Sequence, residues 1–353
     1  MAFVTPSPAS FRGKLPLSRP PFRHEFGTTS MVAPPQEKMH IRTPLVPSPS
    51  ISAPSGRQVL LKLDNLQPAG SFKIRGHGHL CSSAAANGVR HFVSSSGGNA
   101  GAAVAHAGQV LAVPVTIIVP SSTPQFMIDR LKESGASVVV HGAVWDEADR
   151  YAREIVEREG PNAIHISPFD HPLLWEGHAS LVEELKDDLA GKKPAAIVVS
   201  VGGGGLFLGV AEGTRRVGWG DVPIVTAETE GAASFAAMVA AGGEVVQLKE
   251  ISSVAKSLGA LAVSDKCAQW VREGRKVVPV VVSDREAVEA CSLLAVKHRV
   301  LVEPACGAAI AAVLKGVDVG EGPIVVVVCG GNMASPALLQ GWIKATGATE
   351  AVL

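Results

Sequence analysis

A regular alternation of short apolar runs with helical stretches, from residue 58 onward, most constrains the fold of this chain. The runs are rich in Val and Ile, and most are continuously apolar, as expected for strands covered on both faces. We expect strands at Val59–Leu63, His91–Ser94, Val115–Val119, Ser137–Val140, Ala163–Ile166, Ala196–Val201, Ile224–Ala227 and Ile324–Val328. We expect helices that include Gln125–Ser134, Val144–Glu159, Ala179–Leu189 and Pro336–Thr346. Strand–helix repetition of this kind predicts parallel sheets joined by crossover helices.

Composition narrows the class of protein further. The 353 residues correspond to about two domains. Lys+Arg and Asp+Glu cancel at 32 each, which argues against nucleic acid and against a basic membrane-surface protein as partners. The stretch from His91 to Ile128 carries no charge, but glycines and prolines interrupt it before an apolar run reaches the roughly 20 residues of a membrane span. Five widely spaced cysteines without a CxxC pair argue against a disulfide framework or a zinc site.

The first 50 residues differ from the rest, with 10 of the 24 prolines, six Lys or Arg and two acidic residues. Such a start is typical of a transit peptide, although its prolines would break an amphipathic import helix. A disordered tail, or a true start at Met31, is the alternative. We therefore expect residues 1–39 to be a disordered or transit-like extension. We expect a cytoplasmic protein, with organelle targeting through this extension as the alternative.

Four consecutive glycines, Gly202 to Gly205, follow one expected strand and precede an expected helix at Leu206–Val217. Without side chains, successive N–H groups at a helix start can converge on a phosphate. The dinucleotide pattern GxGxxG is absent from this loop, and the P-loop pattern GxxxxGK[ST] is absent from the chain. The loop therefore suits a single phosphate group, and a purely structural tight turn is the alternative.

Two further clusters stand at the carboxyl ends of expected strands, where ligands bind in open α/β sheets. Ser94–Gly101 offers hydroxyls, an amide and N–H groups at the start of an Ala-rich helix, Ala100–Gly108. This arrangement suits a carboxylate, or alternatively is a capped helix without a ligand. Cys329–Asn332 places a cysteine at the end of another strand, where a buried small hydrophobe is the alternative.

Lys73 stands between Phe72 and Ile74, directly after a Pro/Gly turn. We expect it to be partly buried, and burial lowers the pKa of a lysine so that its neutral amine can form a Schiff base. Taken alone, a solvated lysine is the more common outcome. A Schiff-base lysine, a phosphate loop and a carboxylate site together match pyridoxal phosphate (PLP) holding an amino acid.

The segment Leu66–Gly76, with its Ser-Phe-Lys-Ile-Arg-Gly, resembles the cofactor-lysine motif of the serine/threonine dehydratases in the tryptophan synthase β-like (fold type II) group. Further motifs follow in the family's order: Ser96–Gly101, Gly202–Gly205, Glu228–Gly231, Ser253–Gly259, Glu303–Gly307 and Cys329–Asn332. The resemblance covers about residues 40–345 and is closest to the animal-type members.

The resemblance implies that Lys73 carries PLP as a Schiff base and then removes the α-proton of the substrate. The implied cofactor-binding residues are Phe72, Lys73, Asn99, Gly202, Gly203, Gly204, Gly205 and Cys329. The implied substrate-binding residues are Ser96, Gly97, Asn99 and Ala100. Racemases of the group usually carry serine at the position of Cys329, which faces the pyridine nitrogen. This cysteine therefore favours elimination over racemisation.

A monovalent cation, commonly potassium, is also implied by the resemblance. Its expected site is formed by Gly202, Glu228, Ala232, Ser234, Leu258 and Ala260. Oxygen-rich sites suit hard cations. For Glu228, a buried and hydrogen-bonded carboxylate is the alternative.

The implied fold is α/β with two domains, each a mainly parallel twisted sheet flanked by helices. The large PLP-binding domain comprises residues 40–75 and 176–353, the small mobile domain comprises residues 76–175, and the protein is a homodimer.

The implied reaction is the dehydration and deamination of L-serine, and of L-threonine, to pyruvate or 2-oxobutanoate plus ammonia. The protein is then an L-serine ammonia-lyase with L-threonine ammonia-lyase side activity in amino-acid catabolism. Serine racemase, a β-replacement enzyme and a non-catalytic PLP-holding protein are the alternatives.

Overall fold

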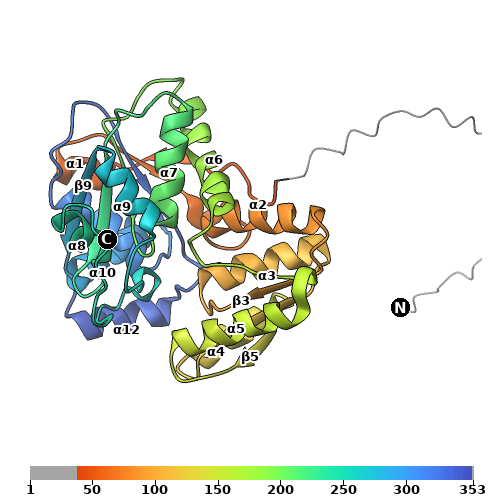
Figure 1. The fold of residues 1–353 in the computed structure, drawn as a ribbon. Helices are drawn as coiled ribbons and strands as arrows, with labels where there is room; N and C mark the ends of the chain where they lie inside the picture. The colour runs from red at the N-terminus through yellow and green to blue at the C-terminus, as the bar shows by residue number, and fades with distance from the viewer. Residues whose placement is uncertain (1–37, 352–353) are drawn as a thin grey trace, which may run out of the picture. The chain divides into compact units, whose positions relative to one another are not determined.

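The computed structural model describes residues 38–351, and the helices and strands that it describes lie between residues 45 and 346 (Figure 1). Of the expected extension at residues 1–39, only Lys38 and Met39 belong to the described residues. The alternative start at Met31 also lies outside them.

The larger sheet has six strands in the order β1-β2-β10-β7-β8-β9. Its strands are β1 (Leu45–Pro47), β2 (Val59–Lys62), β10 (Ile324–Val327), β7 (Ala196–Ser200), β8 (Ile224–Thr229) and β9 (Val277–Val282). β1 pairs antiparallel with β2, and the other neighbouring pairs are parallel. Parallel neighbours need crossover connections, which helices supply here.

The smaller sheet has four parallel strands in the order β5-β4-β3-β6. Its strands are β5 (Ser137–Val140), β4 (Val115–Val119), β3 (His91–Ser94) and β6 (Ala163–His165). Because side chains alternate along a strand, Phe92 and Ile117 belong to one hydrophobic core, and Val93 and Ile118 belong to another on the opposite face.

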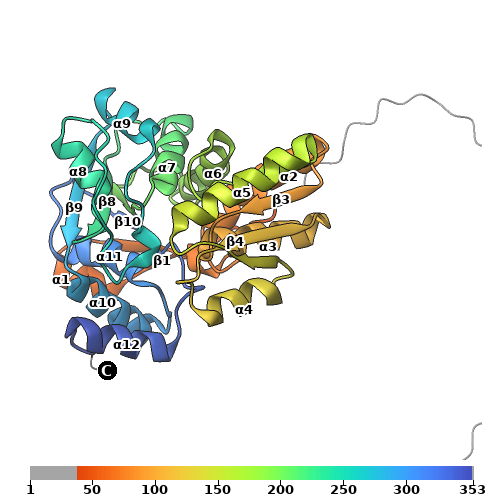
Figure 2. The same cartoon turned by 60° about the horizontal axis from the view of Figure 1, so that its bottom comes forward.

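Helices cover both sheets (Figure 2). They are α1 (Pro49–Ser55), α2 (Lys73–Ala86), α3 (Asn99–Leu111), α4 (Gln125–Glu133), α5 (Trp145–Glu159), α6 (Pro172–Asp188), α7 (Gly205–Arg216), α8 (Ser234–Ala240), α9 (Asp265–Arg272), α10 (Asp284–Leu293), α11 (Pro304–Leu314) and α12 (Pro336–Thr346). On the smaller sheet, α2, α3 and α4 share the core of Phe92, whereas α5 packs on the face of Val93. On the larger sheet, α7 and α11 contact the strands, α6 packs on α7, and α10 packs on α11. The expected α/β fold with mainly parallel sheets is confirmed.

The eight strands expected from the sequence form where they were predicted, to within two residues at either end. The prediction that strands are covered on both faces is wrong for β5, which is an edge strand with three of its four residues exposed. The sequence did not reveal β1, which is short and flanked by prolines, or β9, which contains Pro279. Proline cannot donate to a ladder but is tolerated at a sheet edge, where β9 lies. Helix α6 begins at Pro172 rather than Ala179, with the His171 ring accepting the Leu173 N–H.

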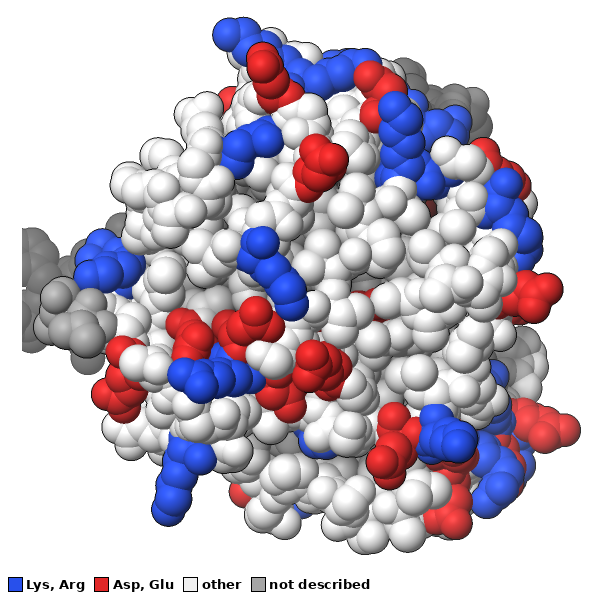
Figure 3. Space-filling model, turned by 90° about the vertical axis from the view of Figure 1, so that its left-hand side faces the viewer, with Lys and Arg blue, Asp and Glu red and all other residues white. Residues whose placement is uncertain are grey.

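The surface of the described part carries charges of both signs. On the face shown in Figure 3, acidic and basic side chains are interspersed among uncharged ones rather than gathered into a continuous basic area. No helix within residues 38–351 combines the length and the apolar character that crossing a bilayer requires.

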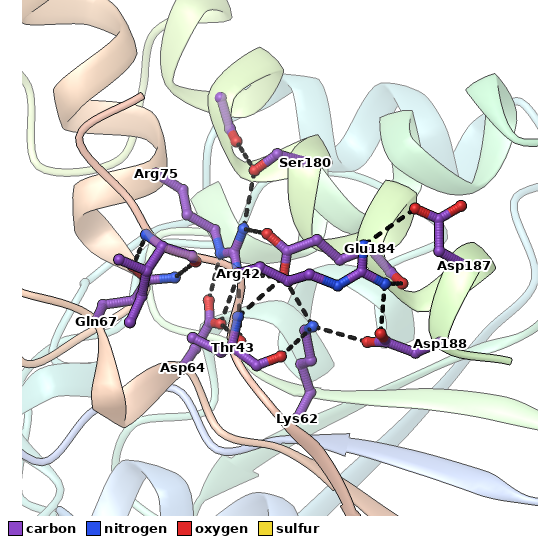
Figure 4. A network of polar contacts seen from close by, with 12 residues as sticks. Arg42, Thr43, Lys62, Asp64, Gln67, Arg75, Ser180, Glu184, Asp187 and Asp188 are labelled. Atoms are coloured by element: carbon purple, nitrogen blue, oxygen red, sulfur yellow. Dashed lines mark hydrogen bonds and ion pairs between the residues drawn. The ribbon is translucent and has the colours of Figure 1, made fainter. Parts of the chain in front are cut away.

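A buried ion network connects β2, α2 and α6 (Figure 4). The guanidinium of Arg75, only 1% exposed, donates to both carboxylate oxygens of Asp64, at 2.7 and 2.8 Å. It also donates to both oxygens of Glu184, at 2.6 and 2.9 Å. The buried Lys62 ammonium lies 2.8 Å from Glu184 and 3.0 Å from Asp188. The network thus fixes the first turn of α2, which begins at Lys73, against two other elements.

Arg75→Ala should destabilise the protein by about 3–5 kcal/mol, because it leaves Asp64 without its cationic partner in a buried site. Urea unfolding of the purified protein measures this. The matched control is Arg215→Ala, which removes an exposed pair with Glu212 and should cost less than about 1 kcal/mol. Equal unfolding midpoints for the two variants would show that the network contributes no special stability.

Candidate active site

Lys73 begins α2 against the carboxyl end of β10. The Phe72 N–H donates to the Cys329 carbonyl at 2.8 Å, and a Cβ at Gly70 would lie 2.7 Å from the Asn332 side chain, so the chain approaches closely here. The Lys73 side chain is half-buried, and its Nζ donates to the Pro168 carbonyl. Burial lowers the pKa of Lys73 to about 8, partly opposed by the electrostatic interaction with Cys329. Its ammonium therefore loses a proton far more readily than that of an ordinary lysine.

The four glycines connect β7 to α7, and each lies against a neighbour that leaves little room for a side chain. A Cβ at Gly203 would lie 2.4 Å from the Phe169 ring, and one at Gly205 would lie 3.0 Å from the Phe169 carbonyl. Gly204 has a φ of +95°, and its Cβ would lie 2.2 Å from the Cys267 sulfur. A Cβ at Gly202 would lie 3.2 Å from Leu258. The first N–H groups of α7 have no partner within the helix, so the loop offers donors to an anion.

The Ser96–Ala100 loop joins β3 to the start of α3. Gly98 is the residue before the helix, and its N–H donates to the Ser96 hydroxyl at 3.4 Å. The Asn99 amide Nδ2 donates to Glu303 at 2.8 and 3.1 Å, whereas its Oδ1 is buried and unpartnered among the described residues. A polar atom in that state is costly unless a ligand or water completes its bonding.

Glu303 is a site residue that sequence reasoning missed. Its carboxylate, on a residue 3% exposed, accepts hydrogen bonds from Asn99, the Ser257 hydroxyl and the Met333 N–H. The Glu303–Gly307 motif supported the resemblance, but nothing in its sequence shows that the carboxylate faces a loop on the other sheet. Glu303 directly precedes α11, which packs on the larger sheet, and its carboxylate orients the Asn99 amide of the loop after β3.

Cys329 follows β10, with its sulfur 3.1 Å from the Cys306 sulfur and 3.9 Å from the Ser200 hydroxyl. Cys306 in turn donates to the Gly330 carbonyl at 2.9 Å. Burial raises the pKa of Cys306 well above its ordinary value, so this thiol stays protonated. Ser200 and Cys306 are further neighbours that the sequence motifs did not reveal.

Phe72 packs against a buried histidine, His178, with ring centroids 4.9 Å apart. The His77 ring contacts the Lys73 carbonyl through Nδ1 at 2.9 Å. Burial lowers the pKa of His77 to about 3, so this ring is neutral. Burial lowers the pKa of His178 as well, so the two neighbouring rings, His77 and His178, are both uncharged beside Phe72 and Lys73.

Residues from separate segments meet between the two sheets. Pro168 and Phe169 are consecutive; the first accepts from Lys73 and the second packs on the glycine loop. A Cβ at Gly330 would lie 3.0 Å from Ser71 and 3.5 Å from the Asn99 amide. The lysine, the glycine loop and the Ser96–Ala100 loop thus surround one region, at the carboxyl ends of strands from both sheets.

The residues expected to hold a cation fall into two contacting groups: Glu228 lies beside the start of α8, and Gly202 lies beside Leu258. Glu228 is fully buried, and its carboxylate accepts the N–H groups of Phe235 and Ala236 at 2.8 and 2.7 Å. Burial raises the pKa of Glu228 to about 7. The Ser234 hydroxyl is buried without a partner among the described residues. Ala232 forms a bridge with Thr229, and Ala260 donates to the Leu258 carbonyl at 2.8 Å.

A half-buried lysine of lowered pKa, a glycine loop at a helix start and a polar loop at parallel strand ends define the site of an α/β enzyme that binds PLP. Residues 37–330 match the model of the pyridoxal-phosphate dependent enzyme family, and the chain belongs to that family.

The chain is 50% identical over 315 residues to the L-serine dehydratase/L-threonine deaminase of Mus musculus, covering 86% of this chain and 95% of the relative. It is also 50% identical over 314 residues to the serine dehydratase-like protein of Rattus norvegicus, covering 86% and 94%. These matches confirm the resemblance found in the motifs.

Solved structures show the same fold. The L-serine ammonia-lyase of Rhizomucor miehei superposes with a TM-score of 0.82 at 35% identity, covering 88% of this chain and all of that one. Maize serine racemase superposes with a TM-score of 0.79 at 27% identity, covering 87% and 93%. The racemase is thus the more distant of the two in sequence.

PLP fits the residues present. The glycine loop packs too closely on Leu258, Phe169 and Cys267 to carry side chains, and the free N–H groups at the start of α7 suit the phosphate. Lys73 has the lowered pKa that covalent attachment requires. The buried Asn99 Oδ1 and Ser71 Oγ lack partners among the described residues, which is consistent with a polar ligand at this place.

Gly203→Ala should lower the affinity for PLP about tenfold or more, because its methyl group would overlap the Phe169 ring. Titration of the cofactor-free protein with PLP, followed by absorbance, measures the affinity. Gly341→Ala on α12, where a Cβ would meet nothing within 4 Å, is the control. Adding Phe169→Leu to Gly203→Ala should recover part of the loss. If the Gly203→Ala variant binds PLP with wild-type affinity, the contact between position 203 and the Phe169 ring does not restrict the loop.

Proposed function

We propose that the protein dehydrates and deaminates L-serine, and L-threonine, to pyruvate or 2-oxobutanoate plus ammonia, using PLP. The observation that carries this proposal is the convergence of Lys73, the glycine loop and the Ser96–Ala100 loop around one region. Its substrate class is supported by relatives at 50% identity named L-serine dehydratase/L-threonine deaminase and serine dehydratase-like.

The residues that would hold PLP come from both sheets. Lys73 would bind it covalently, Gly202–Gly205 would bind its phosphate, and Phe72 would pack on its ring. Asn99 would bond its phenolic oxygen, and Cys329 would lie at its pyridine nitrogen. When bound, PLP supplies an electron sink for the carbanion that forms at the substrate α-carbon.

Lys73 is the proton-transfer group of the proposal. Its lowered pKa leaves a useful fraction of neutral amine near pH 8, and that amine accepts the α-proton. The Pro168 carbonyl, which accepts from Nζ, and the α2 first turn hold the amine in place. The Arg75 network behind that turn limits its movement.

The Ser96–Ala100 loop would bind the substrate carboxylate through Ser96, Gly97, Asn99 and Ala100. Its support is the position of the loop at the start of α3, where free N–H groups and the helix dipole favour an anion. A cavity of about 390 Å³, lined in part by Gly97, Gly98, Arg130 and Asn332, borders the loop.

The proposal divides the chain into a large PLP-binding domain, residues 40–75 and 176–353, and a small mobile domain, residues 76–175. Its support is the separate sheet and core within the second range. Side chains that bond across the boundary include Asn99 to Glu303 and Arg130 to the Asn332 carbonyl. Closure of the small domain would exclude water from the reaction.

The proposal includes a bound potassium ion. The residues proposed to bind it are Gly202, Glu228, Ala232, Ser234, Leu258 and Ala260. The buried, unpartnered Ser234 hydroxyl supports an oxygen-binding cation there. The proposal also holds that the protein is a cytoplasmic homodimer, by resemblance to its family. N-terminal sequencing of the native protein distinguishes this location from organelle targeting through residues 1–39.

Adding L-serine to the PLP-loaded protein tests the proposal. We expect a change in cofactor absorbance, followed by pyruvate and ammonia in equal amounts, with little D-serine. Accumulation of D-serine in place of pyruvate would favour a racemase. An absorbance change without any product would favour the non-catalytic alternative.

Lys73→Ala should lower the rate of pyruvate formation about 100- to 10,000-fold, because it removes the proton-transfer group. The variant should also lose the absorbance of covalently bound PLP. Lys132→Ala, which removes an exposed lysine of α4, is the control and should retain both. Pyruvate formation at the wild-type rate in the Lys73 variant would remove this residue from the mechanism.

The covalent capture of PLP by the cofactor-free protein should depend on pH. Because Lys73 must be neutral and burial lowers its pKa to about 8, the capture rate should rise about tenfold per pH unit below 8 and level off above it. Stopped-flow absorbance at a series of pH values measures this. A rate that keeps rising to about pH 10.4, the value of an ordinary lysine, would contradict the burial effect.

A further inference from the structure

Ser95 lies directly before the loop that is proposed to bind the substrate carboxylate. The residue is fully buried. Its hydroxyl donates to the Asp149 carboxylate at 2.6 Å. Asp149 belongs to α5, on the face of the smaller sheet opposite α3. A side chain from behind the sheet thus holds the residue that precedes the loop.

The Asp149 carboxylate, on a residue 8% exposed, is shared by three donors. Its Oδ1 receives the Ser95 hydroxyl and His165 Nε2, the latter at 2.9 Å, and its Oδ2 receives Arg153 Nε at 2.8 Å. Burial alone would raise the pKa of Asp149, but hydrogen bonds from His165, Ser95 and Arg153 hold it well below its usual range. The carboxylate is therefore ionised at any pH at which the protein works, and charge-assisted bonds of this kind are strong.

Ser95 and His165 lie at the carboxyl ends of two neighbouring parallel strands, β3 and β6. β3 pairs with β6 through Val93 and His165, and the Ser94 hydroxyl donates to the Ile166 carbonyl at 3.1 Å. The chain after β6 continues to Pro168, whose carbonyl accepts from Lys73. One carboxylate therefore fixes both the start of the substrate loop and the segment that holds the lysine.

The loop needs such an anchor because two of its residues are glycines. Gly97 and Gly98 lack side chains and lose more conformational entropy on ordering than other residues. A Cβ at Gly98 would meet nothing within 4 Å, so packing does not restrain this position. Positioning errors of about 1 Å cost up to about 100-fold in rate.

We infer that Asp149 is a positioning residue for substrate recognition, which acts through Ser95 to orient the N–H groups that bind the substrate carboxylate. This inference rests on the proposed function. It goes beyond that function because Asp149 and Ser95 touch neither cofactor nor substrate in the arrangement proposed above.

The test uses Ser95→Ala, Asp149→Ala and the double variant in the PLP-loaded protein. Binding of L-serine and of 2-aminoethanol, which lacks the carboxylate, is followed by cofactor absorbance, and kcat and KM are measured for L-serine. We expect Ser95→Ala, which removes only the bond to Asp149, to raise the KM for L-serine about tenfold, with kcat within about threefold and 2-aminoethanol binding unchanged. Asp149→Ala should raise the KM at least as much. The double variant should be no worse than Asp149→Ala alone, because both changes remove the Ser95–Asp149 bond.

Arg153→Ala is the matched control. Its side chain is 63% exposed and contacts only the other carboxylate oxygen, so the Ser95 bond remains and the KM should change less than about twofold. Thermal unfolding identifies a variant that is merely unfolded, and Ser95→Ala removes a single oxygen in case Asp149→Ala folds poorly.

Equal weakening of L-serine and 2-aminoethanol, or a KM that the variants leave unchanged, would overturn the positioning function of Asp149. Additive effects in the double variant would overturn it as well. A wild-type protein that does not respond to L-serine would instead overturn the proposed function, and this inference with it.

Discussion

The contact between the buried Arg75 guanidinium and the Asp64 and Glu184 carboxylates is the constraint on which the rest of the site depends. Arg75 stands two residues after Lys73 in the first turn of α2, so the same turn carries the reactive amine and its anchor. Because the partners come from the segment after β2 and from α6, the lysine is placed by charges that are far apart in sequence. Buried charges tolerate little displacement, and this makes the position of the amine well defined.

Around that fixed point, the site is assembled from both sheets. Glu303 reaches from the larger sheet to Asn99, and Pro168 reaches from the end of the smaller sheet to Lys73. In the proposed arrangement, backbone N–H groups at two helix starts, rather than Arg or Lys, would bind the anionic groups of cofactor and substrate. The low content of charged residues, 18% of the chain, is consistent with this way of binding anions.

The sequence predicted what is local. Continuous Val and Ile runs revealed the buried strands, and the neighbours of Lys73 indicated its burial. It could not reveal β9, where Pro279 weakens the strand pattern, because only the sheet edge makes that proline acceptable. Nor could it reveal Glu303, Phe169 or Asp149, because each acquires its significance from a contact with a residue distant in the chain. The residues assigned to cofactor, substrate and cation remain predictions.

Phe169 and Gly203 occupy one shared volume although they belong to different segments. Gly203 is not free to change alone, because a methyl group at 203 fits only after the ring at 169 has become smaller. Among descendants of this chain, the two positions should therefore vary together, and the order of their changes should be fixed. As long as position 169 keeps its aromatic ring, position 203 of the glycine loop has to remain glycine.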